Sequence, residues 1–303
     1  MKKHHYRNYC LIILAAIAIC SKSYAQPGKE DIRKLIATEL DSVRKGSIKA
    51  NDYVFTSDNE RDVLFFLVKY ENDPSEEVRL RVQSMKFKLA QQSRDTSIRQ
   101  RVVEDMARNF QLSSHELTQY AVYRLSEFGE KDFSDKTRKI LFDNFERLKE
   151  IHQYIVICGV AQVKALVPRL KQLSQKFDYH QYNWYSTEAW HASLALARMG
   201  ENEKMDAMIA AVELEAEPTL RMTRLLRQVA HTRHPDAIKL LQKYLESGDE
   251  VPSSKPGAKG IEFRHYAVEY LAQYVEGFPI VPRSGKYSVQ EIESARKFLS
   301  SGL

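Results

Sequence analysis

Apolar residues recur at spacings of three and four along most of the chain, which is the pattern of amphipathic helices. Four stretches show it plainly, at 63–70, 78–89, 117–128 and 140–148. Alternating apolar and polar positions, which are typical of strands, are scarce. The pattern therefore predicts an all-α protein.

Helix boundaries are marked by polar residues that can accept hydrogen bonds from the free N–H groups of a first turn. Ser75, Ser114 and Thr187 are each followed by acidic residues, which suit the positive end of the helix dipole. Glycines at 129, 200 and 248 predict helix ends.

The predicted helices come in pairs that resemble one another along the sequence. Ala161, Ala197 and Ala230 occupy similar places near the ends of successive second helices, 36 and 33 residues apart. Leu89 and Leu125 extend the series backwards. A period of this size is typical of a solenoid, in which stacked pairs bury the apolar stripe that one pair cannot bury alone.

These repeats resemble the HEAT family, in which a first helix that often holds a proline is followed by an acidic turn and a second helix beginning Val-Arg. The run Val-Pro-Arg-Leu at 167–170 is similar to the first-helix motif. The run Asn-Asp-Pro-Ser-Glu-Glu-Val-Arg at 72–79 is similar to the turn and second-helix start, and 220–221 and 263–264 are weaker copies. Leu-Ala-Leu-Ala-Arg-Met-Gly at 194–200 looks like a second-helix end.

The resemblance implies an α–α superhelix, a HEAT-like solenoid of about six helix pairs over residues 60–275. The expected organisation is a leader at 1–25, an N-terminal helix and linker or cap at 26–58, and a helical repeat domain at 59–303. Several second helices lack the Val-Arg start, and the helix near 29–45 lies outside the register.

The first 25 residues have the three parts of a secretory signal peptide. Lys2, Lys3 and Arg7 precede an uncharged apolar stretch at 10–20, and a cut after Ala25 would leave small residues at the required positions. The stretch is too short to span a bilayer, which needs about 20 residues. Export to the periplasm or the outside is expected. An uncleaved anchor and lipid attachment at Cys20 are the alternatives.

Removal of this leader changes the charge of the chain. The formal charge of +6 falls to +2, because residues 1–25 hold four basic residues and no acid. A nearly balanced exported chain argues against nucleic acid as the main partner. No second apolar stretch is long enough to span a membrane. Cys158 is then the one remaining cysteine, and its apolar surroundings predict a small buried residue rather than a reactive thiol.

Two interruptions of the repeat lie between the first and second helices of a pair, at 174–186 and at 247–260. Insertions gathered at one edge often mark a binding surface, although a longer loop is also tolerated at little cost. The loop at 247–260 is rich in Pro, Gly and Ser, cannot be helical, and is interpreted as a tolerated insertion.

The loop at 177–185 holds five aromatic residues in nine, and it is the first candidate for binding. Tyrosine and tryptophan offer a large, rigid contact area with a polar tip, which suits a protein, a peptide or sugar rings. The alternative is that the loop folds back and covers its own repeat. The predicted contact residues are Tyr179, Tyr182, Trp184 and Tyr185.

Arginines on the second helices are the second candidate. Arg79, Arg221 and Arg264 share a repeat position, and Arg224 lies on the same face as Arg221 by helical spacing. A row of guanidinium groups would match the carboxylates of an acidic peptide or polyanion. The alternative is that each arginine pairs with an acidic residue of a neighbouring turn, as the HEAT resemblance implies.

No motif for catalysis, metal binding or a cofactor occurs in the sequence. There is no His-Glu-x-x-His, no glycine-rich phosphate loop and no nucleophile elbow. We therefore expect no metal, no cofactor and no catalytic residue. The favoured hypothesis is an exported, non-catalytic scaffold that binds a protein or peptide. The alternative is an enzyme, or a subunit of one, acting on an envelope glycan or another polymer, which would need converging acids near the aromatic loop.

Overall fold

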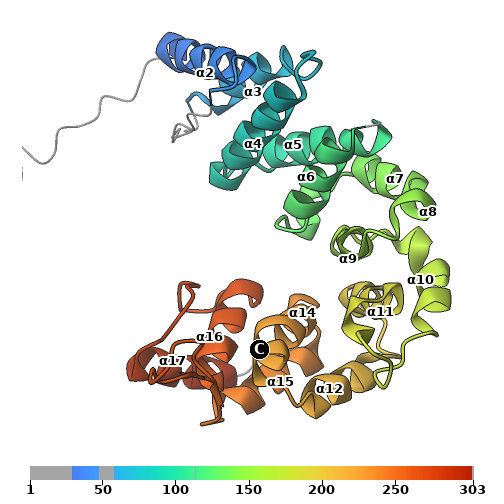
Figure 1. Cartoon of the computed structure of the whole chain (residues 1–303), viewed down its shortest axis with the longest axis vertical. Helices are drawn as coiled ribbons and strands as arrows, with labels where there is room; N and C mark the ends of the chain where they lie inside the picture. The colour runs from blue at the N-terminus through green and yellow to red at the C-terminus, as the bar shows by residue number, and fades with distance from the viewer. Residues whose placement is uncertain (1–28, 48–57, 113, 302–303) are drawn as a thin grey trace, which may run out of the picture. The chain divides into compact units, whose positions relative to one another are not determined.

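The computed structural model describes residues 29–47, 58–112 and 114–301 (Figure 1). Within these ranges the chain is mostly helical, and the strands are the short β1 (Glu250–Val251) and β2 (Ile261–Glu262), which pair antiparallel. The all-α prediction is thus confirmed. The predicted leader, with Cys20, and most of the predicted linker lie outside the described residues.

The chain divides into two compact units, one ending at Ile98 and the other beginning at Arg99. The first contains α2 (Lys29–Arg44), α3 (Glu60–Val68) and α4 (Glu76–Gln92), and α2 packs against both of the others. Its core is formed by the apolar stripes that the sequence pattern indicates, among them the fully buried Val78, Val82 and Leu89.

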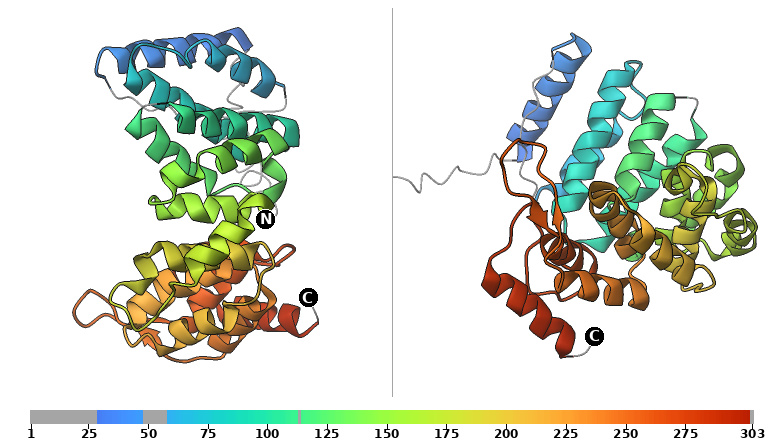
Figure 2. Two further views of the ribbon diagram at one scale, coloured as in Figure 1. Left: turned by 90° about the vertical axis from the view of Figure 1, so that its right-hand side faces the viewer. Right: turned by 60° about the horizontal axis from the view of Figure 1, so that its bottom comes forward.

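The second unit holds the helices that follow in the chain (Figure 2). Helix α5 begins just before the boundary between the units. The α-helices are α5 (Thr96–Arg108), α6 (His115–Leu125), α7 (Asp135–Asp143), α8 (Phe145–Leu148), α9 (His152–Val160), α10 (Val167–Ser174), α11 (Glu188–Arg198), α12 (Met205–Leu214), α13 (Pro218–Leu220), α14 (Leu226–His231), α15 (Pro235–Leu245), α16 (Phe263–Tyr274) and α17 (Val289–Ser300). Short 3-10 turns are η1 (Asn109–Gln111), η2 (Glu130–Asp132), η3 (Lys164–Leu166) and η4 (Trp184–Ser186), and the π-helical turn η5 (Arg221–Leu225) joins α13 to α14.

The predicted helix starts are correct at the level of single hydrogen bonds. The hydroxyl groups of Ser75, Ser114 and Thr187 accept from the backbone N–H three residues later, at the starts of α4, α6 and α11. Each bond satisfies an N–H group that has no partner within the helix, which is typically worth about 1 kcal/mol. These caps fix where the second helices of three pairs begin.

Neighbouring helices of the second unit pack as pairs and as a row. Helices α10 and α11 contact each other, as do α12 and α14, and α15 and α16. The second helix of each pair also contacts the second helix of the next, in the order α6, α9, α11, α14, α16. The two loops that interrupt the repeat therefore connect packed pairs, α10 to α11 and α15 to α16. The latter loop is not helical, as predicted, and it contains the β1–β2 hairpin.

The ends of three second helices in this row are built alike. The residues after α9, α11 and α14 include Gln162, Gly200 and Arg233, all with a left-handed backbone (φ 57°, 87° and 58°). Gln162 Nε2 donates to Arg198 O at 2.8 Å, and Arg198 Nη1 donates to His231 O at 3.4 Å. These bonds join residues 36 and 33 apart, within the period found in the sequence.

Across the described ranges, no helix combines the length and the apolar character that crossing a membrane requires.

Candidate interaction surface

The aromatic loop between α10 and α11 is held down by Trp184. This side chain is 7 % exposed and belongs to the core of the second unit. Its ring lies edge-on to Trp190 of α11, with centroids 4.8 Å apart, and Phe177 packs against both indoles. Trp184 was predicted as a contact residue, but so little of it is exposed that it offers a partner almost no area. Its place fits the alternative in which the loop covers its own repeat.

Tyr182 lies in the same loop and has the opposite environment. Its side chain is 89 % exposed, although it is a large aromatic residue. The next residue, Asn183, has a left-handed backbone (φ 55°), and its side chain accepts a hydrogen bond from Tyr185 Oη at 3.1 Å. Tyr179 and Tyr185 are half-buried against the core. The loop is therefore anchored by some of its rings while another points into solvent.

Arg224 of η5 joins this loop to α14, the second helix of the following pair. Its guanidinium carbon lies 4.6 Å from the ring centroid of Tyr185, which is a cation–π geometry. Its Nη2 donates to Ser186 Oγ at 3.0 Å. A second link joins α11 to α14, where Trp190 Nε1 donates to Gln228 Oε1 at 2.8 Å. We refer to Tyr179, Tyr182, Tyr185 and Arg224 as the aromatic–arginine surface.

Two histidines face each other across the contact between α9 and α11: His152 belongs to α9 and His191 to α11. The rings of His152 and His191 stack with centroids 4.8 Å apart and planes 23° apart. His191 Nδ1 lies 2.8 Å from Thr187 O, which places the proton on Nδ1 and leaves Nε2 as an acceptor. Burial, together with the nearby His152 and Arg224, lowers the pKa of His191 to about 4, although the hydrogen bond to Thr187 O acts in the opposite direction. The imidazole is therefore neutral at pH 7.

Sequence analysis missed this histidine pair. His152 and His191 are 39 residues apart, close to one repeat period, so an alignment of the repeats would have placed them on neighbouring helices.

The other predicted arginines are bound within their own turns. Arg79 Nη1 donates to Asp73 O and Arg221 Nε to Glu215 O, each at 2.6 Å and each to a carbonyl six residues earlier. Arg264 forms an ion pair with Glu262. The acidic partner of Arg264 fits the alternative, whereas these bonds of Arg79 and Arg221 go to backbone carbonyl groups. Only Arg224 of the predicted set contacts the aromatic loop.

Cysteine and metal chemistry find no support in the described part of the chain. Cys158 is fully buried, as predicted, and burial raises the pKa of its thiol. The thiol is thus protonated, and the thiolate is the reactive form. No group of three His, Cys, Asp or Glu residues within the described ranges could hold a metal ion.

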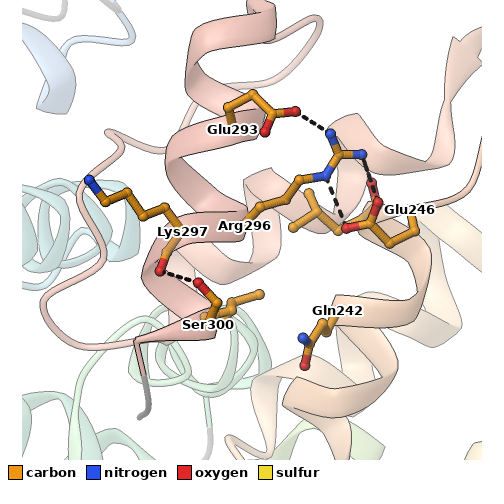
Figure 3. A pocket seen from close by; sticks show the side chains of 8 residues that line it. Gln242, Glu246, Glu293, Arg296, Lys297 and Ser300 are labelled. Atoms are coloured by element: carbon orange, nitrogen blue, oxygen red, sulfur yellow. Dashed lines mark hydrogen bonds and ion pairs between the residues drawn. The ribbon is translucent and has the colours of Figure 1, made fainter.

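A pocket of 350 Å³ lies between α15 and α17 (Figure 3). Arg296 crosses it and forms ion pairs with Glu246, at 2.9 Å, and with Glu293. Its charge is therefore neutralised by two carboxylates, and these contacts fasten α17 to α15. Since Arg296 is already satisfied, the pocket is a weaker candidate than the aromatic–arginine surface.

Comparison with known proteins adds no family to this description: no family model matches the chain, and no curated protein and no solved structure matches it.

Proposed function

We propose that this protein is an exported, non-catalytic scaffold of HEAT-like repeats that binds another protein through its aromatic–arginine surface. The observation that carries the proposal is the exposure of Tyr182, 89 %, in a loop whose neighbouring rings are anchored in the core. A large ring on a rigid support binds at a low cost in conformational entropy, and tyrosine and arginine are enriched among residues that dominate binding.

The solenoid part of the proposal is supported by the repeated construction of the second unit. Its second helices pack in a row, and the ends of α9 and α11 are linked to the next helix by hydrogen bonds of 36- and 33-residue separation. Stacked repeats give extended surfaces of this kind. Export is supported by the signal-peptide pattern at 1–25.

An enzyme acting on a glycan needs two carboxyl groups that converge on one bond. The carboxylate inside the aromatic loop, Asp178, is exposed and accepts a hydrogen bond from the backbone N–H of His180 at 2.9 Å. Its contact is that of a turn residue. No specific observation favours the enzyme over the scaffold.

A capture experiment tests the proposal. The tagged chain is incubated with envelope extract as wild type, as Tyr182→Ala and as Tyr123→Ala. Tyr123 is a matched control, because it is a tyrosine of the same unit and 67 % exposed. We expect Tyr182→Ala to reduce the recovered partner about tenfold, which corresponds to about 1.4 kcal/mol, and Tyr123→Ala to leave it unchanged. Equal recovery with all three proteins would contradict the proposal.

A further inference from the structure

Arg224 has N–H donors that remain available to a ligand. A guanidinium group carries five N–H donors, and the Arg224 bond to Ser186 Oγ uses one of them. The side chain is exposed, and it forms no ion pair with any carboxylate within the described ranges. By contrast, Arg221, in the same π-helical turn, directs its Nε and Nη2 to the carbonyl oxygen of Glu215.

The surroundings of Arg224 fix its position without neutralising its charge. The face of Tyr185 lies against the guanidinium group at 4.6 Å, and Ser186 Oγ holds one edge of it. The partners that hold the guanidinium group, Tyr185 and Ser186, are therefore neutral. The positive charge of Arg224 disfavours the protonated form of His191 and so contributes to the lowered pKa of that imidazole.

We propose that Arg224 anchors a carboxylate of an acidic peptide segment in the protein partner, while the tyrosines of the same aromatic loop contact apolar side chains of that segment. This inference rests on the proposed function and specifies the chemistry of the partner. A fixed guanidinium group suits a carboxylate, because it presents two parallel N–H donors to two oxygens. Its position is already set by Tyr185 and Ser186, so little conformational freedom is lost on binding.

A peptide fits this surface better than a nucleic acid or polyphosphate. Binding to a polyanion depends on several basic groups that each neutralise a phosphate. Here one unpaired arginine is accompanied by tyrosines, and the chain without its leader carries a formal charge of only +2. One charge beside apolar ring surface matches a glutamate or aspartate within a mixed apolar sequence.

Fluorescence anisotropy on the full chain tests this inference with a labelled short peptide that alternates glutamate and leucine. We expect saturable binding, and at least about tenfold weaker binding of a peptide with glutamine in place of glutamate, since a hydrogen bond to a charged group is worth that much. Arg224→Ala should weaken binding about tenfold. Arg224→Lys should restore part of it, because the charge remains while the forked geometry is lost.

Arg94→Ala serves as the control, because it removes an exposed arginine of the first unit and should leave the affinity unchanged. Equal binding by wild type and Arg224→Ala, or equal binding of the two peptides, would overturn the inference. Stronger competition by short polyphosphate than by the glutamate peptide would assign the site to polyanions and overturn it as well. If the partner is still captured from extract in a Tyr182-dependent way while the peptide does not bind, this inference fails and the proposed function stands.

Discussion

Trp184→Ala is expected to lower the free energy of unfolding by about 3 kcal/mol, whereas Tyr182→Ala, two residues away, changes it by less than about 0.5 kcal/mol. The physical reason is the difference in burial, 7 % against 89 % exposed. Removal of the Trp184 indole leaves a cavity beside Trp190 and Phe177 and deletes an edge-on ring contact at 4.8 Å. Removal of the Tyr182 phenol leaves no cavity, because solvent already surrounds it.

Chemical denaturation of the two single variants measures this difference. A triple substitution of Tyr182, Trp184 and Tyr185 would confuse the two roles, because the loss of Trp184 alone would unfold the loop. Similar stability losses for Trp184→Ala and Tyr182→Ala would show that the loop is not anchored as described. In that case Tyr182 could no longer be treated as a surface residue.

Gly159→Ala is the second variant with a large expected effect, a loss of about 2 kcal/mol in the free energy of unfolding. A Cβ atom at this position would lie 2.7 Å from Ala195 Cα and 3.0 Å from Ala195 O. Both atoms belong to the backbone of α11, so α9 and α11 would have to move apart. Alanine is favoured over glycine inside a helix by about 1 kcal/mol, and the clash must exceed this gain.

The control for this variant is Gly248→Ala, where a Cβ atom would meet no other atom within 4 Å. We expect it to change stability by less than about 0.5 kcal/mol. The double variant Gly159→Ala, Ala195→Gly removes only the Cβ atom of residue 195 and leaves its Cα and O in place, so most of the stability loss is expected to remain. A stabilised Gly159→Ala protein would mean that the two helices do not approach so closely.

The helical class could be predicted from the sequence because it depends on local signals. Spacings of three and four place apolar residues on one face of a helix, and Val78, Val82 and Leu89 are indeed buried. The caps at Ser75, Ser114 and Thr187 depend on one side chain and a backbone N–H three residues away, so they too can be found locally.

The end of a helix was harder to predict from the sequence where no glycine marks it. Gly200 was predicted as a helix end, and it has a left-handed backbone (φ 87°). Gln162 and Arg233 have the same conformation at the corresponding ends of α9 and α14. Left-handed residues are mostly glycine or asparagine, so nothing in the identity of these two residues indicates the turn.

The candidate site could be predicted only as a region. Composition identified the aromatic loop, but it could not separate the buried Trp184 from the exposed Tyr182, because the run has no helical or strand periodicity. Arg221 and Arg224 lie on one helical face by spacing, yet one donates to a backbone carbonyl and the other reaches the loop. Such differences arise from contacts between residues far apart in the sequence.

Photo-cross-linking from position 182 shows whether a partner lies against Tyr182. A benzophenone amino acid replaces Tyr182 in one protein and Tyr123 in another, and both are irradiated in the same envelope extract. We expect one dominant cross-linked partner from position 182, lost on competition with the unlabelled wild-type chain, and little or none from position 123. Cross-links of equal yield from both positions, or none from position 182 while the chain still captures its partner, would contradict this expectation.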